Sequence, residues 1–146
     1  MVSGLVLFLT LAASSVESQT TDELRKRYGQ PDAERFVVRS AITVTARYAR
    51  NGRPCELLIE PRHSLMPDQA APAPMSPETS TKVIDEMVPL NERGPLIRDI
   101  TFTGGCSSIR VIEYRDVRIT RLIACSPGKS NKERAVHIEF KKAACR

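Results

Sequence analysis

The chain has 146 residues, of which 41% are hydrophobic and 27% are charged, and its net charge is +5. This length suits one domain, and this balance of apolar and charged residues excludes an intrinsically disordered chain. Aromatic residues make up 5% of the chain and tryptophan is absent, so we expect a core of Val, Ile and Leu.

Residues 5–13 form an apolar run, LVLFLTLAA, near the start of the chain. A run of this length is too short to cross a bilayer, which takes about 20 residues, but it matches the apolar segment of a secretory signal peptide. A buried N-terminal strand is the alternative. We expect residues 1–18 to be a signal peptide and residues 19–146 to form one domain of an exported protein, periplasmic or extracellular. No later segment is apolar enough to predict a transmembrane segment.

Residues 20–31 predict a short helix followed by a stop. Thr20 and Glu23 have the spacing of a capping box, in which each side chain accepts a hydrogen bond from the other residue's backbone N–H. Gly29 then ends the helix. After a turn, residues 35–38 predict a short strand.

The pattern around Asn51-Gly52 predicts a β-hairpin. Apolar and polar residues alternate over residues 41–49 and 55–60, as in strands with one buried face. Asn-Gly is the preferred dipeptide of a two-residue type I′ turn, in which both residues have positive φ. This turn sets the pairing of the strands, which we expect to be Arg50–Arg53, Tyr48–Cys55, Arg47–Glu56, Ala46–Leu57 and Val44–Ile59.

Residues 61–77 contain five prolines and predict an exposed loop, because proline disrupts both strands and helices. Ser76 and Pro77 then predict the start of a helix, as its N-cap and its first residue. Pro89 ends this helix. Its apolar stripe, which we expect to pack on the sheet, comprises Val83, Ile84, Met87 and Val88.

A second hairpin is predicted around Arg115-Asp116, between residues 108–114 and 117–123. A two-residue and a four-residue loop give the same pairing, namely Glu113–Arg118, Ile112–Ile119 and Arg110–Arg121. The last of these pairs joins like charges, which requires a solvated face or an anion beside it.

The order of the elements predicts the fold class. Residues 99–103 and 135–141 predict two further strands, and a loop at residues 126–134 precedes the last one. Hairpins separated by single helices are typical of the α+β class. We therefore expect a mostly antiparallel sheet of hairpins with two helices packed on one face.

All four cysteines, Cys55, Cys106, Cys125 and Cys145, follow the predicted signal peptide. An even number of cysteines in an exported protein predicts disulfides. The register of the second hairpin places Cys106 opposite Cys125, within disulfide range, which leaves Cys55 to pair with Cys145. The spacing contains neither C-x-x-C nor a zinc-ligand pattern, so we expect no redox or metal site.

No motif in the chain predicts a catalytic residue or a cofactor. Gly128-Lys129-Ser130 lacks the upstream glycine of a phosphate-binding loop. His63 and His137 have no metal-ligand spacing, and no nucleophile motif is present. We expect no nucleic-acid partner either, because aromatic residues for base stacking are scarce.

The positive charge lies in the last quarter of the chain. Residues 19–109 hold 12 basic and 12 acidic side chains, whereas residues 110–146 hold 10 and 4. Such asymmetry favours an anionic partner, although a solubilising surface also produces it. The candidate contact residues are Arg110, Arg118, Arg121, Lys129 and Lys132.

Two stretches of the chain resemble parts of known proteins. Residues 23–38 and 42–60 are similar to the helix, Gly-x-Pro turn and hairpin of the small lipoproteins in the bacterial outer-membrane assembly machine. The Tyr-Gly-x-Pro-Asp motif at residues 28–32 also resembles that of uncharacterised exported bacterial proteins. These resemblances imply a protein of the cell envelope and carry over no site residue.

The sequence favours binding over catalysis. We expect a non-catalytic binding or scaffold protein of the bacterial cell envelope, which contacts an anionic envelope component or protein. The alternative is a periplasmic or secreted hydrolase, whose site forms only in the folded chain.

Overall fold

The computed structural model describes residues 20–62, 75–126 and 129–145. The predicted signal peptide and most of the proline-rich loop lie outside the described residues. The contacts divide the chain into two compact units, residues 1–31 and residues 32–146. The second unit contains the whole sheet.

The first unit contains helix α1 (Thr21–Tyr28), whose predicted capping box is confirmed. The backbone N–H of Thr20 donates to the Glu23 carboxylate at 2.8 Å, and the backbone N–H of Glu23 donates to the Thr20 hydroxyl at 3.3 Å. The helix ends at Gly29, whose φ of 86° favours glycine. No residue of α1 is buried, and its packing on the sheet stays a prediction.

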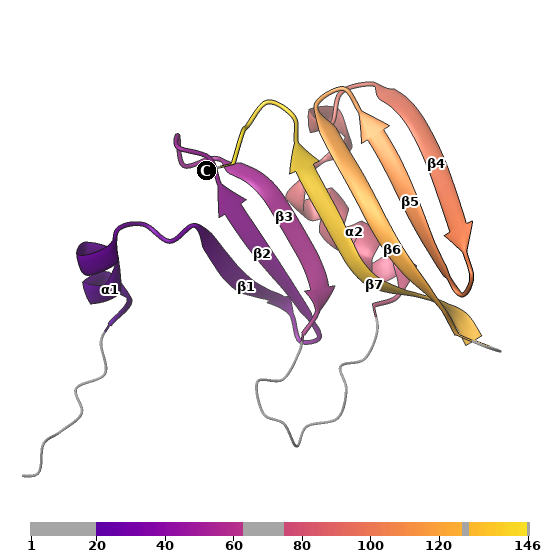
Figure 1. Cartoon of the computed structure of the whole chain (residues 1–146), viewed down its shortest axis with the longest axis horizontal. Coiled ribbons are helices and arrows are strands. Elements are labelled where there is room, and N and C mark those ends of the chain that lie inside the picture. The colour runs from indigo at the N-terminus through magenta and orange to yellow at the C-terminus, as the bar shows by residue number, and fades with distance from the viewer. Residues whose placement is uncertain (1–19, 63–74, 127–128, 146) are drawn as a thin grey trace, which may run out of the picture. The chain divides into compact units, whose positions relative to one another are not determined.

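The second unit is built on one antiparallel sheet of seven strands, in the order β1-β2-β3-β7-β6-β5-β4. The strands are β1 (Ala33–Arg39), β2 (Ile42–Tyr48), β3 (Pro54–Pro61), β4 (Leu96–Gly104), β5 (Ser107–Tyr114), β6 (Val117–Ser126) and β7 (Lys129–Phe140). Figure 1 shows helix α2 on one face of this sheet. The predicted α+β class, with its antiparallel sheet of hairpins, is therefore confirmed.

Helix α2 (Pro77–Met87) begins where the sequence predicts. The hydroxyl of its N-cap Ser76 accepts the backbone N–H of Thr79 at 3.2 Å. Of the predicted apolar stripe, the buried members are Val83, Ile84 and Val88. The prediction is wrong for Met87, which is 37% exposed, because the chain leaves helical geometry at the next residue and turns inward. A short 3₁₀ helix, η1 (Leu90–Glu92), follows.

The core lies between α2 and the inner face of the sheet. Its side chains alternate along the strands with side chains of the other face, as the period of two requires. The most deeply buried members on the strands are Val44, Ile59, Val117, Ile119, Val136 and Ile138. Burial of side chains of this size stabilises the fold by about 1.5–3 kcal/mol each. A one-residue slip would turn them outward, so the core fixes the register.

The first hairpin forms, but its turn differs from the predicted type. Gly52 has a φ of 76°, whereas Asn51 has a negative φ, so the turn is not of type I′. The backbone N–H of Ala49 donates to the carbonyl of Arg53 at 2.9 Å, which closes a three-residue loop. The Asn51 side chain accepts the backbone N–H of Arg53 at 3.0 Å and stabilises this conformation. The predicted pairing of Arg50 with Arg53 is therefore wrong.

The longer loop changes the register only next to the turn. Farther along, the predicted pairs Arg47–Glu56, Ala46–Leu57 and Val44–Ile59 are confirmed. Tyr48 pairs with Pro54 rather than with Cys55, so that predicted pair is wrong. Cys55 is the extra residue of a β-bulge, which compensates for the extra residue in the loop.

The second hairpin has the predicted register. Its pairs include Glu113–Arg118, Ile112–Ile119 and Arg110–Arg121. The two arginines of the last pair do not face each other unpaired, because Arg110 binds Asp99 and Arg121 binds Glu133. Each arginine of this like-charged pair therefore has a carboxylate of its own, which supplies the neighbouring anion that the pair requires.

Two strands begin three or more residues earlier than the sequence predicts. β4 begins at Leu96, three residues earlier than predicted, and includes a register shift between Leu96 and Arg98. β7 begins at Lys129, so the predicted loop at residues 126–134 is wrong over most of its length. A bulge at Arg134, opposite Leu122 and Ile123 of β6, interrupts the period of two, and the polar sequence therefore does not show the strand.

The two halves of the sheet meet where β3 pairs with β7, through a ladder of four residue pairs. Cys55 and Cys145 form a disulfide beside this ladder, as predicted, with their Cα atoms 5.3 Å apart. Ala49 also makes an antiparallel bridge with Cys145. The disulfide therefore ties the first hairpin to the segment that follows β7.

Candidate functional site

We name the face of the sheet opposite α2 the open face. The alternation along β6 distinguishes the two faces, because Arg121 is buried beneath α2 whereas the adjacent Leu122 is 37% exposed. The open face carries two different surfaces. One is a network of charged side chains, and the other is a group of exposed apolar side chains.

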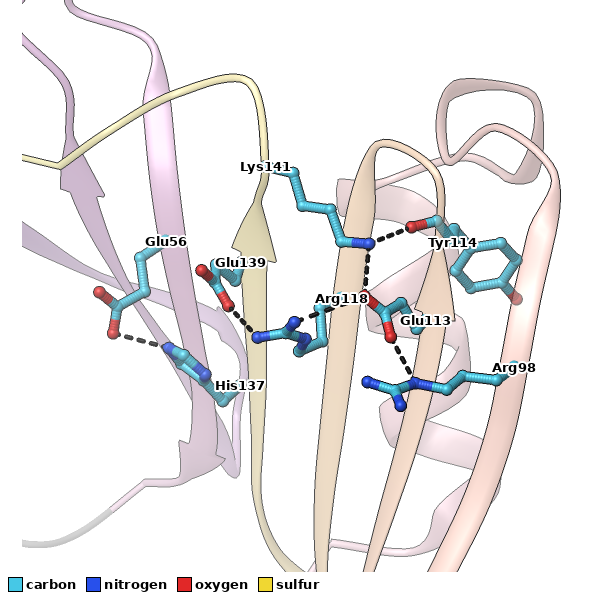
Figure 2. A network of polar contacts seen from close by, with 8 residues as sticks. All are labelled: Glu56, Arg98, Glu113, Tyr114, Arg118, His137, Glu139 and Lys141. Carbon is cyan, nitrogen blue, oxygen red and sulfur yellow. Dashed lines mark hydrogen bonds and ion pairs between the residues drawn. The ribbon is translucent and has the colours of Figure 1, made fainter.

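Glu113 is the centre of the charged network (Figure 2). One carboxylate oxygen accepts hydrogen bonds from Lys141 at 2.7 Å and from Arg118 at 3.4 Å, and the other accepts from Arg98. Lys141 also donates to the backbone carbonyl of Tyr114 at 2.8 Å. The hydrogen bond from Lys141 lowers the pKa of Glu113 to about 2, with the help of Arg98 and against the effect of desolvation.

The network continues across the junction of β3 and β7. Glu56 and Glu139 are paired directly across these strands, and like charges in such positions destabilise a sheet. Glu56 lies 2.7 Å from His137 Nε2 and 2.8 Å from Arg47, and Glu139 accepts from Arg118 at 3.2 Å. Burial raises the pKa of Glu56, but the hydrogen bond and charge of His137, together with Arg47, hold it below its ordinary value. Cations therefore neutralise both carboxylates at the junction.

The apolar patch, as we name it, consists of Ile100, Phe102, Ile109, Val111 and Leu122. Phe102 is 59% exposed and Ile109 is 41% exposed. The members are neighbours across strands, because Phe102 pairs with Ile109 and Ile109 pairs with Leu122. Contiguous exposed apolar side chains of this kind mark contact surfaces.

Lys132 and Arg134 lie beside the apolar patch. Lys132 pairs with Ala124 of β6, which places it on the open face, and Arg134 is the extra residue of the bulge in β7. Arg134 and Leu122 contribute to the wall of a shallow hollow of about 370 Å³. Its other lining residues are Cys106, Ser107, Ile123 and Ala124. Over the residues that the structure describes, Lys132 and Arg134 have no carboxylate partner.

The structure does not bring the predicted contact residues together on one surface. Arg110 lies on the face that α2 covers and binds Asp99 through hydrogen bonds of 2.9 and 2.6 Å. Arg118 belongs to the charged network, and the side chain of Lys129 lies outside the described residues. Of the predicted contact residues, Lys132 lies on the open face and makes no ion pair with a described residue.

Sequence reasoning missed Arg134 and the apolar patch. Arg134 could have been found as the next cation after Lys132 in the basic last quarter of the chain. The patch members appear in the sequence only as apolar residues of predicted strands. Their exposure follows from the position of α2 on the opposite face of the sheet, which no local pattern shows.

Arg121, another predicted contact residue, belongs to the core. Its guanidinium donates to the Glu133 carboxylate, to the Ser80 hydroxyl at 2.9 Å and to the Pro77 carbonyl at 3.1 Å. Glu133 is fully buried, and its second carboxylate oxygen has no hydrogen-bond partner in the described part of the chain. This pair connects the first turn of α2 to β6 and β7.

The remaining cysteines are partly described. The register of the second hairpin extends to the pair Ser107–Ala124. Continued by one residue, the same register sets position 106 opposite position 125. Cys106 is exposed and makes no described disulfide, and the side chain of Cys125 lies outside the described residues. The Cys106–Cys125 pairing therefore stays a prediction.

The described residues offer no metal site. Residues 20–62, 75–126 and 129–145 contain no cluster of three or more His, Cys, Asp or Glu side chains that could hold a metal ion. His63 lies outside these ranges. His137 hydrogen bonds with Glu56, and neither of them lines the described hollow. The hydrolase alternative stays a prediction with no described site.

Comparisons with known proteins give no family for this chain. No protein-family model matches it, and neither the curated proteins nor the solved structures contain a match. The resemblances to outer-membrane assembly lipoproteins and to exported proteins with Tyr-Gly-x-Pro-Asp therefore stay predictions. Within the described residues, no helix combines the length and the apolar character that crossing a membrane requires.

Proposed function

We propose that this chain is a non-catalytic binding protein of the bacterial cell envelope, which contacts an anionic partner through the open face of its sheet. One observation carries the proposal: the exposed apolar patch lies beside Lys132 and Arg134, whose charges have no carboxylate partner among the described residues. The partner that suits both features is an anionic lipid.

The two parts of such a lipid correspond to the two parts of the surface. The acyl part would cover Phe102, Ile109 and Leu122, and removal of apolar area from water contributes about 25 cal/mol per Å². The acidic headgroup would lie near Lys132 and Arg134, and each cation close to an anionic membrane surface contributes about 1 kcal/mol. Neither contribution is large alone, so binding needs both.

The charged network is a weaker candidate for the same role. Arg98, Arg118 and Lys141 all donate to Glu113. An incoming anion would have to replace these internal hydrogen bonds, and Glu113 would then lose partners that stabilise its charge. We therefore assign the contact to the patch and its two cations rather than to the more numerous arginines of the network.

Export is part of the proposal. The Cys55–Cys145 disulfide supports it, because structural disulfides persist mainly in oxidising compartments. The apolar run at residues 5–13 supports it as a signal peptide. The resemblance of residues 23–38 to envelope proteins favours the same compartment.

Sedimentation with lipid vesicles tests the proposal. We expect the protein to bind vesicles that contain anionic lipid at low salt, and to lose most of this binding near 1 M salt, where the Debye length falls to about 3 Å. Vesicles of zwitterionic lipid are the control and should retain little protein. Absence of binding to anionic vesicles at low salt would rule the proposal out, and so would equal binding to both kinds of vesicle.

A further inference from the structure

β4 is an open edge of the sheet. It is the last strand in the sheet order and pairs with β5 on one side only (Figure 1). All of its residues from Leu96 to Gly104 are exposed. A strand of this kind presents unpaired backbone N–H and C=O groups along its free side, which can pair with another strand.

From Ile100 to Gly104, β4 carries none of the features that usually prevent pairing at an edge. Natural edges carry charged side chains, proline or a bulge. β4 contains no proline, and its register shift lies at its start, before Arg98. Its two charged side chains precede this segment, and both bind partners within the sheet, Arg98 to Glu113 and Asp99 to Arg110.

The opposite edge, β1, differs in these respects. It carries the charged residues Glu34, Arg35 and Arg39, and its register shifts between Val37 and Arg39. These features discourage pairing with another chain. β4 is therefore the edge that is suited to accept a strand.

We propose that β4 pairs with β4 of a second copy of this chain, antiparallel and with Thr101 at the twofold axis, to form a continuous sheet across a homodimer. This inference is independent of the proposed lipid contact. Residues that pair across antiparallel strands lie on the same face, so the axis must pass through a residue of β4. The choice among these residues follows from the pairs that each would create.

An axis at Thr101 places Ile100 of each copy opposite Phe102 of the other on the open face. Aromatic and β-branched residues form favourable cross-strand pairs. On the other face this axis places Asp99 opposite Thr103. An axis at Asp99 would bring two like charges together, and an axis at Ile100 would set Arg98 against Phe102. An axis at Phe102 would set Ile100 against Gly104, which has no side chain to pair with it. Of these four axes, the one at Thr101 therefore creates the most favourable pairs.

The dimer would also join the two apolar patches. Both copies keep the same face of the sheet outward, so Ile100 and Phe102 of the two patches become neighbours across the new ladder. The exposed side chains of β4, among them Phe102 at 59% exposure, would lose part of their contact with water. An interface between two edge strands buries little surface area, so we expect a weak dimer with a Kd of about 1 to 100 µM.

Light scattering combined with a crosslink tests the dimer. Thr101→Cys is introduced with Cys106→Ser and Cys125→Ser, so that the other thiols outside the Cys55–Cys145 disulfide are removed. At the proposed axis the two Cα atoms at position 101 lie about 4.5–5.5 Å apart, within disulfide range. We expect mild oxidation to give a covalent dimer. Thr103→Cys in the same background is the control, because its two copies lie about 13 Å apart along the strands.

A charge introduced at the interface provides a second test of the dimer. Ile100→Lys should raise the dimer Kd of the otherwise unmodified chain by at least about tenfold, because it places a charge opposite Phe102 of the partner copy. Val37→Lys on β1, another exposed β-branched residue, should leave the Kd unchanged. A monomer at all concentrations up to about 1 mM overturns the proposal. So does a dimer that Val37→Lys dissociates, or one in which Thr101→Cys does not crosslink.

Discussion

Glu113 shows how one carboxylate can connect several strands. It lies on β5 and accepts hydrogen bonds from Arg98 of β4, from Arg118 of β6 and from Lys141 after β7 (Figure 2). Isolated ion pairs at a surface contribute little to stability, but the Glu113 side chain is 12% exposed and has three cationic partners. At the scale of single residues, the ionisation of Glu113 therefore connects three neighbouring segments of the sheet.

We predict that Glu113→Gln flattens the acid limb of the stability curve. The ordinary pKa of the group is 4.5 and its pKa in the folded chain is about 2. Because the folded pKa is lowered, the contribution of Glu113 is complete above the unfolded pKa and is lost as the pH falls through the folded one. The free energy of unfolding, measured by denaturant titration at a series of pH values, should therefore fall less steeply between about pH 4.5 and 2 in the variant.

Lys141→Gln is the companion variant for this prediction. It removes the partner whose hydrogen bond lowers the pKa of Glu113 most, so the slope should lie between those of the wild type and Glu113→Gln. Equal slopes in all three proteins would show that Glu113 does not contribute in this way.

At the scale of elements, the Arg121–Glu133 pair fixes helix α2 on the sheet. Arg121 on β6 donates to Glu133 on β7 and to Pro77 and Ser80 in the first turn of α2. A buried ion pair is costly to break, because the remaining charge loses its partner, and yet replacement of the whole pair by apolar residues is often neutral.

We predict that Arg121→Met lowers the free energy of unfolding by about 3–5 kcal/mol, because Glu133 is left charged and unpaired in the core. The double variant Arg121→Met, Glu133→Leu should recover most of this loss. Denaturant titration of the single and double variants measures both effects. A double variant as unstable as Arg121→Met alone would show that the hydrogen bonds to α2 dominate instead.

The elements also show where local sequence was sufficient. The alternation on both sides of Asn51-Gly52 predicted the strands and most of their register, since burial of one face allows only one register. It did not predict the three-residue loop, because Asn-Gly is compatible with more than one turn and the Asn51 side chain favours the observed one. The strand at residues 129–134 was missed because the bulge at Arg134 breaks its alternation.

The candidate site was less predictable for a topological reason. Lys132 was predicted from the charge asymmetry, and the structure places it on the open face. Arg110 and Arg121 carry the same charge in the same segment but lie on the face that α2 covers. Which cations find carboxylates depends on strands that are distant in sequence, and that information is absent from a local pattern.

At the scale of the whole molecule, the Cys55–Cys145 disulfide secures the junction of the two halves of the sheet. The β3–β7 ladder there has four residue pairs, and the disulfide closes a loop across a sequence separation of 90 residues. On the chain-entropy model, a loop of this length corresponds to about 4–5 kcal/mol of stabilisation.

We predict that Cys55→Ala together with Cys145→Ala lowers the free energy of unfolding by about 4 kcal/mol, mainly by enlarging the unfolded ensemble. Amide hydrogen exchange should become faster first in β3 and in the end of β7, where the ladder is short. Equal exchange in both proteins at these strands would contradict the assigned role. Non-reducing peptide mapping of the wild type would in addition show whether Cys106 is joined to Cys125.

The central claim is that the open face, rather than net positive charge alone, binds an anionic lipid. The most direct measurement compares vesicle affinities of two variants with the same net charge. Lys132→Gln with Arg134→Gln removes the cations beside the apolar patch, whereas Lys82→Gln with Arg53→Gln removes exposed cations on α2 and at the first hairpin turn. At low salt we expect the first variant to bind anionic vesicles about 30-fold more weakly than the wild type, on the basis of about 1 kcal/mol per cation. The second variant should bind as the wild type does, and equal losses in both variants would contradict the claim.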